Sequence, residues 1–443
     1  MNFQDTLSYL LSLGHETLTI KLGLTNTQTL LEALGNPQKN FPAVQIAGTN
    51  GKGSTAVMLD SICHAARIRV GLFTSPHLIS ITERVRVNGE PISQTEFARI
   101  TAHVQQTAER LVDSGNLEAL PTFFEHITAI ALLAFSDAKV ELAILETGLG
   151  GRLDSTTAAE ADVVAITSIA MDHEEYLGHS LEEIAAEKGA IIRPRVTTIV
   201  APQKQEVLKV ILDRCETERV EPKIIKSDSI RIIDTSSDGR YCANFKTNND
   251  NYDNILLGLR GRHQVTNAAV AIGLVEALNK RGFVISKEAI KRGLETACHP
   301  GRLEIRELHP RILFDGAHNP AAALALRDYL DEFVTGPITM IFGAMRDKAV
   351  DEMAAILFPK ATELILTEVD NPRGASLEML KSIVGGELAN RAHYSKSPAE
   401  ALQIATELAG RTGLICVTGS LYLVGAIQEA TKPEILESSF AKA

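Results

Sequence analysis

A glycine-rich segment at residues 47–55, AGTNGKGST, stands between an apolar stretch typical of a β-strand and a longer stretch with helical spacing. Glycines allow successive backbone N–H groups to turn toward one point without an intervening Cβ, and the N-terminus of the following helix adds partial positive charge. Lys52 adds a compact positive charge at the same place. The segment therefore predicts a phosphate-binding loop at the start of a βα unit.

The match of this segment to the common GxxxxGK[ST] loop is incomplete. Ile46 stands where the first glycine is expected, and Gly53 follows the lysine in place of a hydroxyl residue. A glycine-rich helix entry that only packs closely is the alternative interpretation. The lysine, the hydroxyl side chains and the flanking strand and helix together favour phosphate binding.

Short β-rich runs alternate with longer helical patterns in the first half of the chain, which predicts βαβ units on a mainly parallel sheet, and hence an α/β fold. The expected strands are 42–48, 70–74, 141–146, 162–168 and 197–202. The expected helices are 53–67, 95–112, 122–136 and 181–192. Residues 226–262 lose this rhythm and are expected to form short strands and turns.

The length of 443 residues exceeds the ~250 to 300 residues at which single cores stop growing, so we expect two domains. After a helical pair at 264–295, Pro300 and Gly301 indicate a linker. The βα rhythm then restarts, with strands running into loops at 311–319, 338–345, 363–370 and 413–420. The predicted division is a first domain at 1–297, a linker at 298–302 and a smaller α/β domain at 303–443.

Composition excludes several classes of protein. The formal charge of -11 argues against nucleic acid or an anionic membrane as a partner. The five cysteines form no CxxC pair, so neither a zinc site nor a disulfide framework is expected, and a reducing cytoplasm fits best. Residues 1–16 do not resemble a secretory signal, and no apolar run approaches the ~20 residues of a membrane span.

The segment GTNGKGS after a strand resembles the phosphate loop of the Mur ligase superfamily, whose members join a carboxylate to an amine at the expense of ATP. Eight further segments narrow the resemblance: 73–89 (FTSPHLISITERVRVNG), 123–135 (FFEHITAIALLAF), 145–157 (LETGLGGRLDSTT), 167–178 (TSIAMDHEEYLG), 187–191 (EKGAI), 300–304 (PGRLE), 315–320 (DGAHNP) and 417–425 (VTGSLYLVG). In this order they resemble the folylpolyglutamate synthase and dihydrofolate synthase family, from about residue 20 to residue 425. The resemblance implies a P-loop, Mur-ligase-like N-terminal ATPase domain that also holds the pteroate site, and a Rossmann-like C-terminal glutamate-ligase domain.

The resemblance also implies where ATP and magnesium bind. The ATP contacts are Thr49, Asn50, Gly51, Lys52, Gly53, Ser54, Asn267, Arg302 and Asp315, and the metal ligands are Ser75, Glu146, His173 and Lys188. Hard oxygen donors suit Mg²⁺, of which two ions are expected, and Glu146 follows a strand at the edge where parallel sheets bind ligands. His173 taken alone is equally a capping or core histidine, because imidazole prefers softer metals. Lys188 matches the family's lysine that becomes a carbamate. The alternative interpretation is a solvated lysine near a helix C-terminus, without a role in the site.

The pteroate-bearing substrate is expected at Thr122, Phe123, Phe124, Glu125, Leu153, Asp154 and Ser155, and the incoming glutamate at His318 and Ser420. Aromatic faces stack on flat heterocycles and carboxylates accept their N–H donors, although Phe123 and Phe124 also begin an apolar helical pattern. Asp315 and His318 are alternatively ordinary turn residues beside Pro320. Thr157 replaces the asparagine that usually ends the family's RLDSTN motif.

The implied reaction begins when a substrate carboxylate attacks the γ-phosphorus of ATP, and the glutamate amine then displaces phosphate from the acyl phosphate. Lys52, Lys188 and His318 are the residues expected to take part most directly. Dihydropteroate or a reduced folate, L-glutamate and ATP are the expected partners, and a monomer is the expected assembly. Two alternatives stay open: an enzyme that only extends folates and a non-catalytic ATP-binding paralogue. A cell-wall Mur ligase is not expected, because it should carry a further N-terminal domain and the phosphate loop stands too near the start of this sequence for one.

Overall fold

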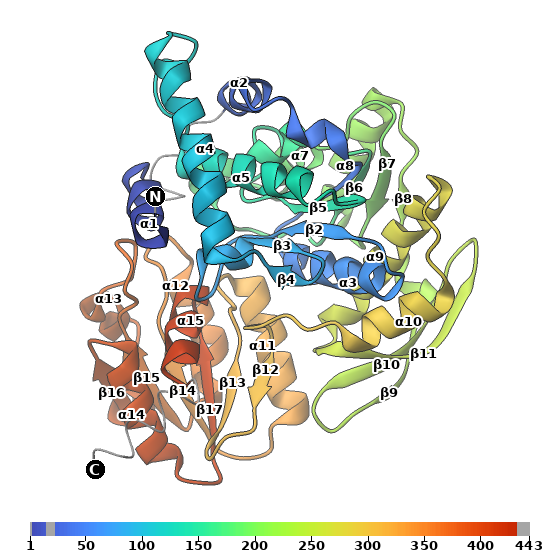
Figure 1. Cartoon of the computed structure of the whole chain (residues 1–443). Coiled ribbons are helices and arrows are strands. Elements are labelled where there is room, and N and C mark those ends of the chain that lie inside the picture. Colours follow the sequence, from blue (N-terminus) through green and yellow to red (C-terminus); the bar gives the residue numbers. More distant parts are fainter. Residues whose placement is uncertain (1, 15–22, 432–443) are drawn as a thin grey trace.

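The computed structural model describes residues 2–14 and 23–431 of the chain (Figure 1). The expectations about the outermost residues, namely the domain limits at 1 and 443, the last two residues of the 1–16 segment and the start of the resemblance near residue 20, lie outside the described residues. Two parallel-stranded sheets dominate the structure, one in each half of the chain. The predicted α/β class is therefore confirmed.

The N-terminal half contains an eight-stranded sheet in the order β4-β3-β2-β5-β1-β6-β7-β8. Its strands are β1 (Ala43–Ala47), β2 (Val70–Phe73), β3 (Val85–Val87), β4 (Glu90–Pro91), β5 (Leu142–Glu146), β6 (Val163–Ile166), β7 (Thr197–Val200) and β8 (Lys223–Ile224). The β2–β3 and β3–β4 pairings at one edge are antiparallel, so β3 runs against the direction of the other strands. The central strands are buried along their whole length, as expected when helices cover both faces of a parallel sheet.

Helices cover both faces of this sheet (Figure 1). One face carries α3 (Lys52–Ala65), α9 (His263–Lys280) and α10 (Lys287–Thr296). The other face carries α4 (Gln94–Asp113), α5 (Phe123–Asp137), α7 (Leu181–Gly189) and α8 (Gln205–Glu218). The shorter helices are α1 (Phe3–Ser12) and α2 (Thr25–Ala33), which pack near α4 and α5, and α6 (Glu174–Leu177).

A three-stranded antiparallel sheet follows the parallel one: β9 (Ile230–Thr235), β10 (Arg240–Lys246) and β11 (Asn251–Arg260). The sequence predicted only short strands and turns here, because alternation is weak in β9, whereas β10 alternates clearly between buried and less buried residues. The sheet also contacts the C-terminal half, since the Tyr241 hydroxyl donates to Glu332 Oε2 at 2.7 Å and the Tyr329 hydroxyl donates to the Asp238 carbonyl at 3.0 Å.

The C-terminal half contains a six-stranded sheet in the order β12-β13-β17-β14-β15-β16, with only β12 antiparallel. Its strands are β12 (Glu304–Arg306), β13 (Arg311–Phe314), β14 (Ile338–Phe342), β15 (Glu363–Thr367), β16 (Ala392–Ser395) and β17 (Leu414–Thr418). The helices are α11 (Pro320–Phe333), α12 (Val350–Leu357) and α13 (Leu377–Ser382) around one hydrophobic cluster, and α14 (Pro398–Ala409) and α15 (Leu421–Ala430) around the other. The predicted Rossmann-like arrangement is confirmed.

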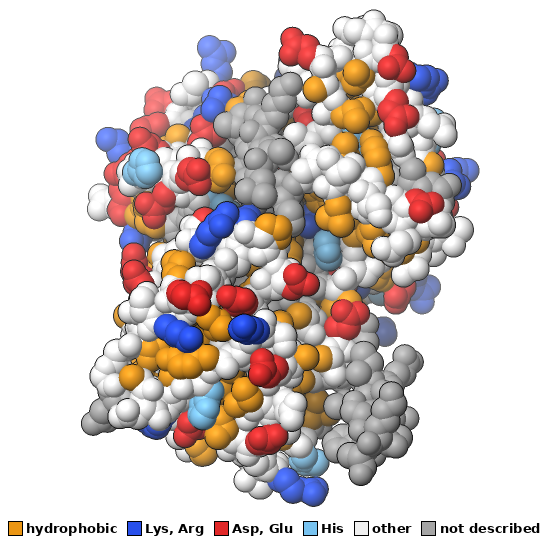
Figure 2. All heavy atoms as spheres, turned by 90° about the vertical axis from the view of Figure 1, so that its left-hand side faces the viewer, with side chains coloured by type: hydrophobic (Ala, Val, Ile, Leu, Met, Phe, Trp, Pro, Cys, Tyr) orange, Lys and Arg blue, Asp and Glu red, His pale blue; other side chains and the backbone are white. Residues whose placement is uncertain are grey.

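The expected strands of both parallel sheets all form, and the sequence missed short strands at or next to the sheet edges, such as β3, β8, β12 and β16. Residues 297–303 lie between α10 and β12 without regular structure, where the linker was expected. The domain limits at 297 and 303 stay a prediction. On the face at the left of Figure 1, acidic and basic side chains are intermingled rather than separated into patches (Figure 2).

Candidate active site

A cavity of about 520 Å³ lies where loops from both halves of the chain meet. In the N-terminal sheet these loops follow β1, β2, β5 and β6, and in the C-terminal sheet they follow β13, β14, β15 and β17. Ligands of open parallel sheets bind outside the carboxyl ends of the strands, so two such edges facing one cavity suit a reaction between several substrates.

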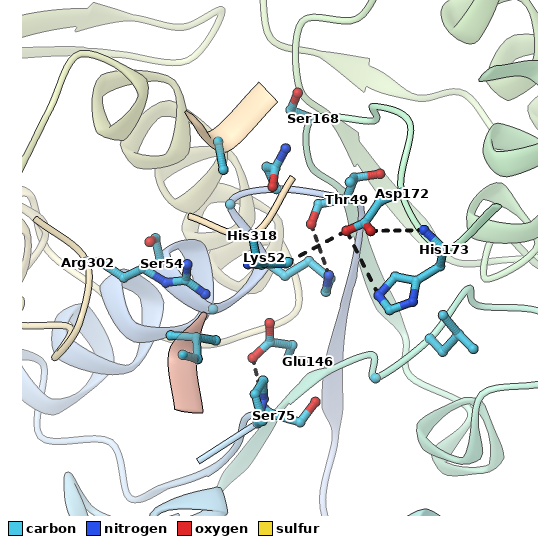
Figure 3. Close-up of a pocket in the computed structure, with 18 of the residues that line it drawn as sticks. Thr49, Lys52, Ser54, Ser75, Glu146, Ser168, Asp172, His173, Arg302 and His318 are labelled. Atoms are coloured by element: carbon cyan, nitrogen blue, oxygen red, sulfur yellow. Dashed lines mark hydrogen bonds and ion pairs between the residues drawn. The ribbon is translucent and has the colours of Figure 1, made fainter. Parts of the chain in front are cut away.

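The structure brings almost all predicted site residues to this cavity (Figure 3). Those that line it are Thr49, Asn50, Gly51, Lys52, Gly53, Ser54, Ser75, Thr122, Phe124, Glu125, Glu146, Leu153, Asp154, Ser155, His173, Lys188, Asn267, Arg302, Asp315, His318 and Ser420. Phe123 is the exception: it is 5% exposed in the hydrophobic core, with the Arg84 guanidinium over its ring. Phe123 is therefore a core residue, as its alternative interpretation had it.

The predicted phosphate loop connects β1 to α3. Gly51 precedes the helix with a φ of 90°, and a Cβ there would lie 2.4 Å from Asn267 Oδ1, so a glycine is needed. The backbone N–H groups of Thr49 and Asn50 donate to the Ser168 carbonyl at 2.8 and 3.0 Å, which ties the loop to the segment after β6. The N-terminus of α3, which begins at Lys52, is therefore the part of the loop that would meet an anion, and one of its N–H groups, that of Gly53, already donates to Glu146.

Lys52 lies against this loop, and its Nζ donates to the carbonyls of Gly48 and Thr49 at 3.0 and 3.2 Å. Burial lowers the pKa of Lys52, and the nearby carboxylate of Glu146 opposes that shift. The Lys52 side chain is partly buried, and an ammonium group that donates to carbonyl oxygens in such a place gains strongly from an anion beside it.

The predicted metal ligands line the same cavity. Glu146 Oε2 accepts the backbone N–H of Ser75 at 3.2 Å, and burial raises the pKa of Glu146. Burial lowers the pKa of His173 to about 3, which keeps its imidazole neutral, as a metal ligand must be. Among residues 2–14 and 23–431 no three His, Cys, Asp or Glu side chains form a metal cluster. This donor set fits Mg²⁺, which binds few protein ligands and keeps waters and phosphate oxygens.

Lys188 is 3% exposed at the end of α7, so it is not the solvated lysine of the alternative interpretation. Burial lowers the pKa of Lys188 to about 7, and the positive charge of Lys52 acts in the same direction. Near neutral pH a substantial fraction of this amine is therefore uncharged and nucleophilic.

The wall expected to hold the pteroate group consists of Phe124, Leu149 and Leu153 together with polar groups that are already engaged. Glu125 Oε2 accepts the backbone N–H of Thr122 at 2.7 Å and caps α5. The Asp154 carboxylate accepts the N–H groups of Gly148 and Leu149 at 2.8 and 3.0 Å and that of Thr156 at 3.0 Å. Asp154 therefore organises its loop, and its contact with a substrate stays a prediction.

The C-terminal half contributes Arg302, Asp315 and His318. Arg302 Nη1 donates to the Gly316 carbonyl at 3.2 Å, and Asp315 accepts the N–H groups of Leu303 and Ala317, both at 3.0 Å. Burial raises the pKa of Asp315 to about 6. His318 Nδ1 lies 2.8 Å from the Gly316 carbonyl, so it carries the proton and Nε2 is an acceptor, while burial lowers the pKa of His318 to about 4.

Sequence reasoning missed an interdomain cluster around Asp172. Lys348 Nζ donates to Asp172 Oδ1 at 2.5 Å and lies 3.2 Å from His173 Nε2, and Asn319 Nδ2 donates to Asp172 Oδ2 at 3.1 Å. Asn319 also exchanges amide hydrogen bonds with Asn50 of the phosphate loop at 3.0 and 3.4 Å. Through these contacts the C-terminal half is joined directly to the phosphate loop.

Arg373, in the turn after β15, also lines the cavity and pairs with Asp347. The signal that could have found Lys348 and Arg373 is their position just beyond two predicted strands of the second sheet, where cations face the ligand edge.

Comparison with known proteins defines the class of protein first. Residues 46–275 match the Mur ligase middle domain, and residues 301–421 match the Mur ligase glutamate ligase domain. Both halves of the chain are thus Mur ligase domains.

Individual relatives are similar over nearly the whole chain. The dihydrofolate synthase/folylpolyglutamate synthase of Bacillus subtilis is 34% identical over 97% of this chain and 99% of its own length. The folylpolyglutamate synthase of Lacticaseibacillus casei is 31% identical over 97% and 98%. The chain therefore belongs to the folylpolyglutamate synthase and dihydrofolate synthase family of the Mur ligases.

Solved structures agree. Folylpolyglutamate synthase from Mycobacterium tuberculosis, complexed with ADP and AMPPCP, has a TM-score of 0.88 at 30% identity and covers 97% of this chain and 98% of its own. FolC from Escherichia coli, in complex with DHPP and ADP, has a TM-score of 0.86 at 31% identity and covers 99% of both chains. A bifunctional folylpolyglutamate synthase/dihydrofolate synthase with Mn, AMPPNP and L-glutamate bound has a TM-score of 0.83 at 30% identity, with 97% and 98% coverage.

Proposed function

We propose that this chain is an ATP-dependent ligase that joins L-glutamate both to dihydropteroate and to reduced folates, releasing ADP and phosphate. The observation that carries the proposal is the one cavity shared by the phosphate loop and Glu146 of the N-terminal half and by Arg302, His318, Lys348 and Arg373 of the C-terminal half. The ligands bound by the relatives support it: ADP and DHPP in one structure, and Mn, AMPPNP and L-glutamate in another.

In the first step the substrate carboxylate attacks the γ-phosphorus of ATP, and ADP leaves. Lys52 and Arg302, with the N–H groups at the start of α3, stabilise negative charge on the transferring phosphoryl group. The product is an acyl phosphate, whose phosphate leaves far more readily than oxide would leave a carboxylate. The protein's main contributions are alignment and neutralisation of charge.

In the second step the glutamate amine attacks the acyl carbon, phosphate leaves and an amide forms. Lys348 and Arg373 are the cations of the C-terminal loops beside the cavity, and they match the two carboxylates of glutamate. Neutral His318 offers an acceptor nitrogen to the amine, and Ser420 lines the same region. Closure of the two halves excludes water, which would otherwise hydrolyse the acyl phosphate.

Ser75, Glu146 and His173 are the side chains that would hold Mg²⁺, which, when bound, neutralises charge on the phosphate oxygens. Lys188 is proposed to react with carbon dioxide: its neutral Nζ adds to the carbon atom, one proton is released, and a carbamate anion forms in place of a cation. The lowered pKa of Lys188, about 7, supplies the neutral amine that this addition needs.

Two narrower proposals concern the cellular location and the oligomeric state of the enzyme. No helix in the described part of the chain has the length and apolar character of a membrane span. All five cysteines are free thiols, which suits the proposed reducing cytoplasm. A monomer is proposed because both halves of the cavity come from one chain.

The activity is tested with purified protein, Mg-ATP and glutamate, adding dihydropteroate in one reaction and a reduced folate in another. Formation of a glutamyl product from both acids is expected. Product from the reduced folate alone would reduce the function to folate extension, and ATP binding without product from either acid would support a non-catalytic paralogue instead.

A further inference from the structure

Gln45 is a fully buried glutamine in the middle of β1, and it does not line the cavity. Its neighbours Val44 and Ile46 belong to the core on the opposite face of the sheet. The side chain of Gln45 lies on the other face, where Nε2 meets Thr156 Oγ1 at 2.9 Å and Thr157 Oγ1 at 2.8 Å in the short 3-10 helix Ser155–Ala159. No step of the proposed reaction uses this residue.

The direction of these hydrogen bonds follows from the second partner of each threonine hydroxyl. Thr157 Oγ1 lies 2.8 Å from the Gly151 carbonyl, which can only accept, so the Thr157 proton points to Gly151 and Gln45 must donate. The Thr156 hydroxyl donates in the same way to Asp154 Oδ1. The Gln45 amide therefore donates to both threonine hydroxyls, and the protons of these hydroxyls point to Asp154 and to Gly151.

Asp154 connects this hydrogen-bond network to the wall of the cavity. Its Oδ2 accepts the N–H groups of Gly148 and Leu149, the first residues to turn away from β5. At Gly148 a Cβ would lie 2.4 Å from Phe124 Cζ, so the Phe124 ring lies directly on the loop backbone. A shift of the backbone at 148–149 would therefore move the ring that lines the cavity.

We propose that Gln45 is a positioning residue for the organic-acid substrate: through Thr156 and Thr157 it holds the loop at 147–157 in the shape that places Phe124, Leu149 and Leu153 against the flat ring of a pteroate-type acid. This inference rests on the proposed function. Gln45 itself touches no reacting atom, and it acts only through the two threonines.

The effect is specific to one substrate because the ATP side of the cavity is held by other contacts. The phosphate loop is fixed by the Ser168 carbonyl and by Asn319, neither of which belongs to the Gln45 network. Loss of the network is therefore expected to weaken binding of the acid and to leave binding of ATP nearly unchanged.

The test uses two substitutions that break the network and two matched controls. Gln45→Met keeps the length of the side chain but donates no hydrogen bond, and Thr157→Val keeps the shape but removes the hydroxyl. Thr157→Ser retains the hydroxyl, and Ile144→Val trims a fully buried side chain of the neighbouring strand β5 without touching the network. Each protein is assayed for KM of the acid, KM of ATP and kcat, and for equilibrium binding of dihydropteroate without ATP.

We expect Gln45→Met and Thr157→Val to raise the KM and the dissociation constant of the acid about tenfold, as the loss of a few buried hydrogen bonds would, with the KM of ATP changed less than about twofold. Thr157→Ser and Ile144→Val should stay within about twofold of wild type for both substrates. Unchanged acid binding in both network variants overturns the inference, as does an equal rise in both KM values. If wild type forms no glutamyl product and binds no acid, the proposed function has failed instead.

Discussion

Lys52→Met separates the role of this lysine in catalysis from its role in folding, because methionine keeps most of the apolar stem and removes the charge. In the structure Lys52 makes two hydrogen bonds to loop carbonyls, each contributing about 1 kcal/mol net. Against them stands the cost of partly removing an ammonium from water, which reaches several kcal/mol on full burial and is the main reason that the pKa of Lys52 is lowered. The ligand-free variant should therefore unfold at the same temperature as wild type or a higher one.

Catalysis should respond in the opposite way. Removing one positioned group that stabilises transition-state charge costs a factor of about 10² to 10³ in kcat, or roughly 3 to 4 kcal/mol. The assay is ADP release with the acid and glutamate present, alongside thermal unfolding without ligands, and Lys280→Met at an exposed position of α9 is the control. Near-normal turnover in Lys52→Met would refute the phosphate-binding role of Lys52. A marked fall in unfolding temperature would show that the two hydrogen bonds outweigh the cost of desolvating the ammonium.

Three further predictions concern other sites. Lys188→Glu, which supplies a carboxylate at similar reach, should keep more activity than Lys188→Ala, and equal activity in the two would argue against an anion at this position. Gly148→Ala should raise the KM of the acid substrate more than that of ATP, because the new Cβ would lie 2.4 Å from the Phe124 ring, and steady-state kinetics with each substrate varied decides this. Among the described residues no hydrogen-bond partner reaches the buried Oδ1 of Asp60, and burial raises the pKa of Asp60 from 3.8 to about 6. The folded state therefore binds more protons than the unfolded state between these values, so stability is lost as pH rises through this window. Asp60→Asn should accordingly stabilise the protein at pH 7 by up to about 3 kcal/mol, with the gain disappearing near pH 4, as denaturant unfolding at the two pH values would show.

The parts of the fold that sequence predicts well are those with a strong local pattern. The strand before the phosphate loop, β5 and β17 are mainly apolar runs followed by turn residues, and all three form as expected. Strands β3, β8 and β16 are two to four residues long and carry little pattern of their own, since pairing with a neighbour is what stabilises them.

The candidate site divides in the same way. Motif resemblance predicts which residues lie at the cavity, and twenty-one of the predicted residues do. It does not predict how each one is engaged: Asp154 accepts hydrogen bonds from its own loop, and Phe123 turns into the core. Asp172 and Lys348 are 176 positions apart in the chain, so their contact depends on how the two sheets face each other.

The central claim is that the terminal phosphoryl group of ATP passes to the carboxylate of an organic acid before the amide forms. It is tested most directly by labelling that carboxylate with a heavy oxygen isotope, running the complete reaction with Mg-ATP and glutamate, and analysing the released phosphate by mass spectrometry. The account predicts one labelled oxygen in each phosphate that accompanies an amide product. Amide product accompanied by unlabelled phosphate would contradict it.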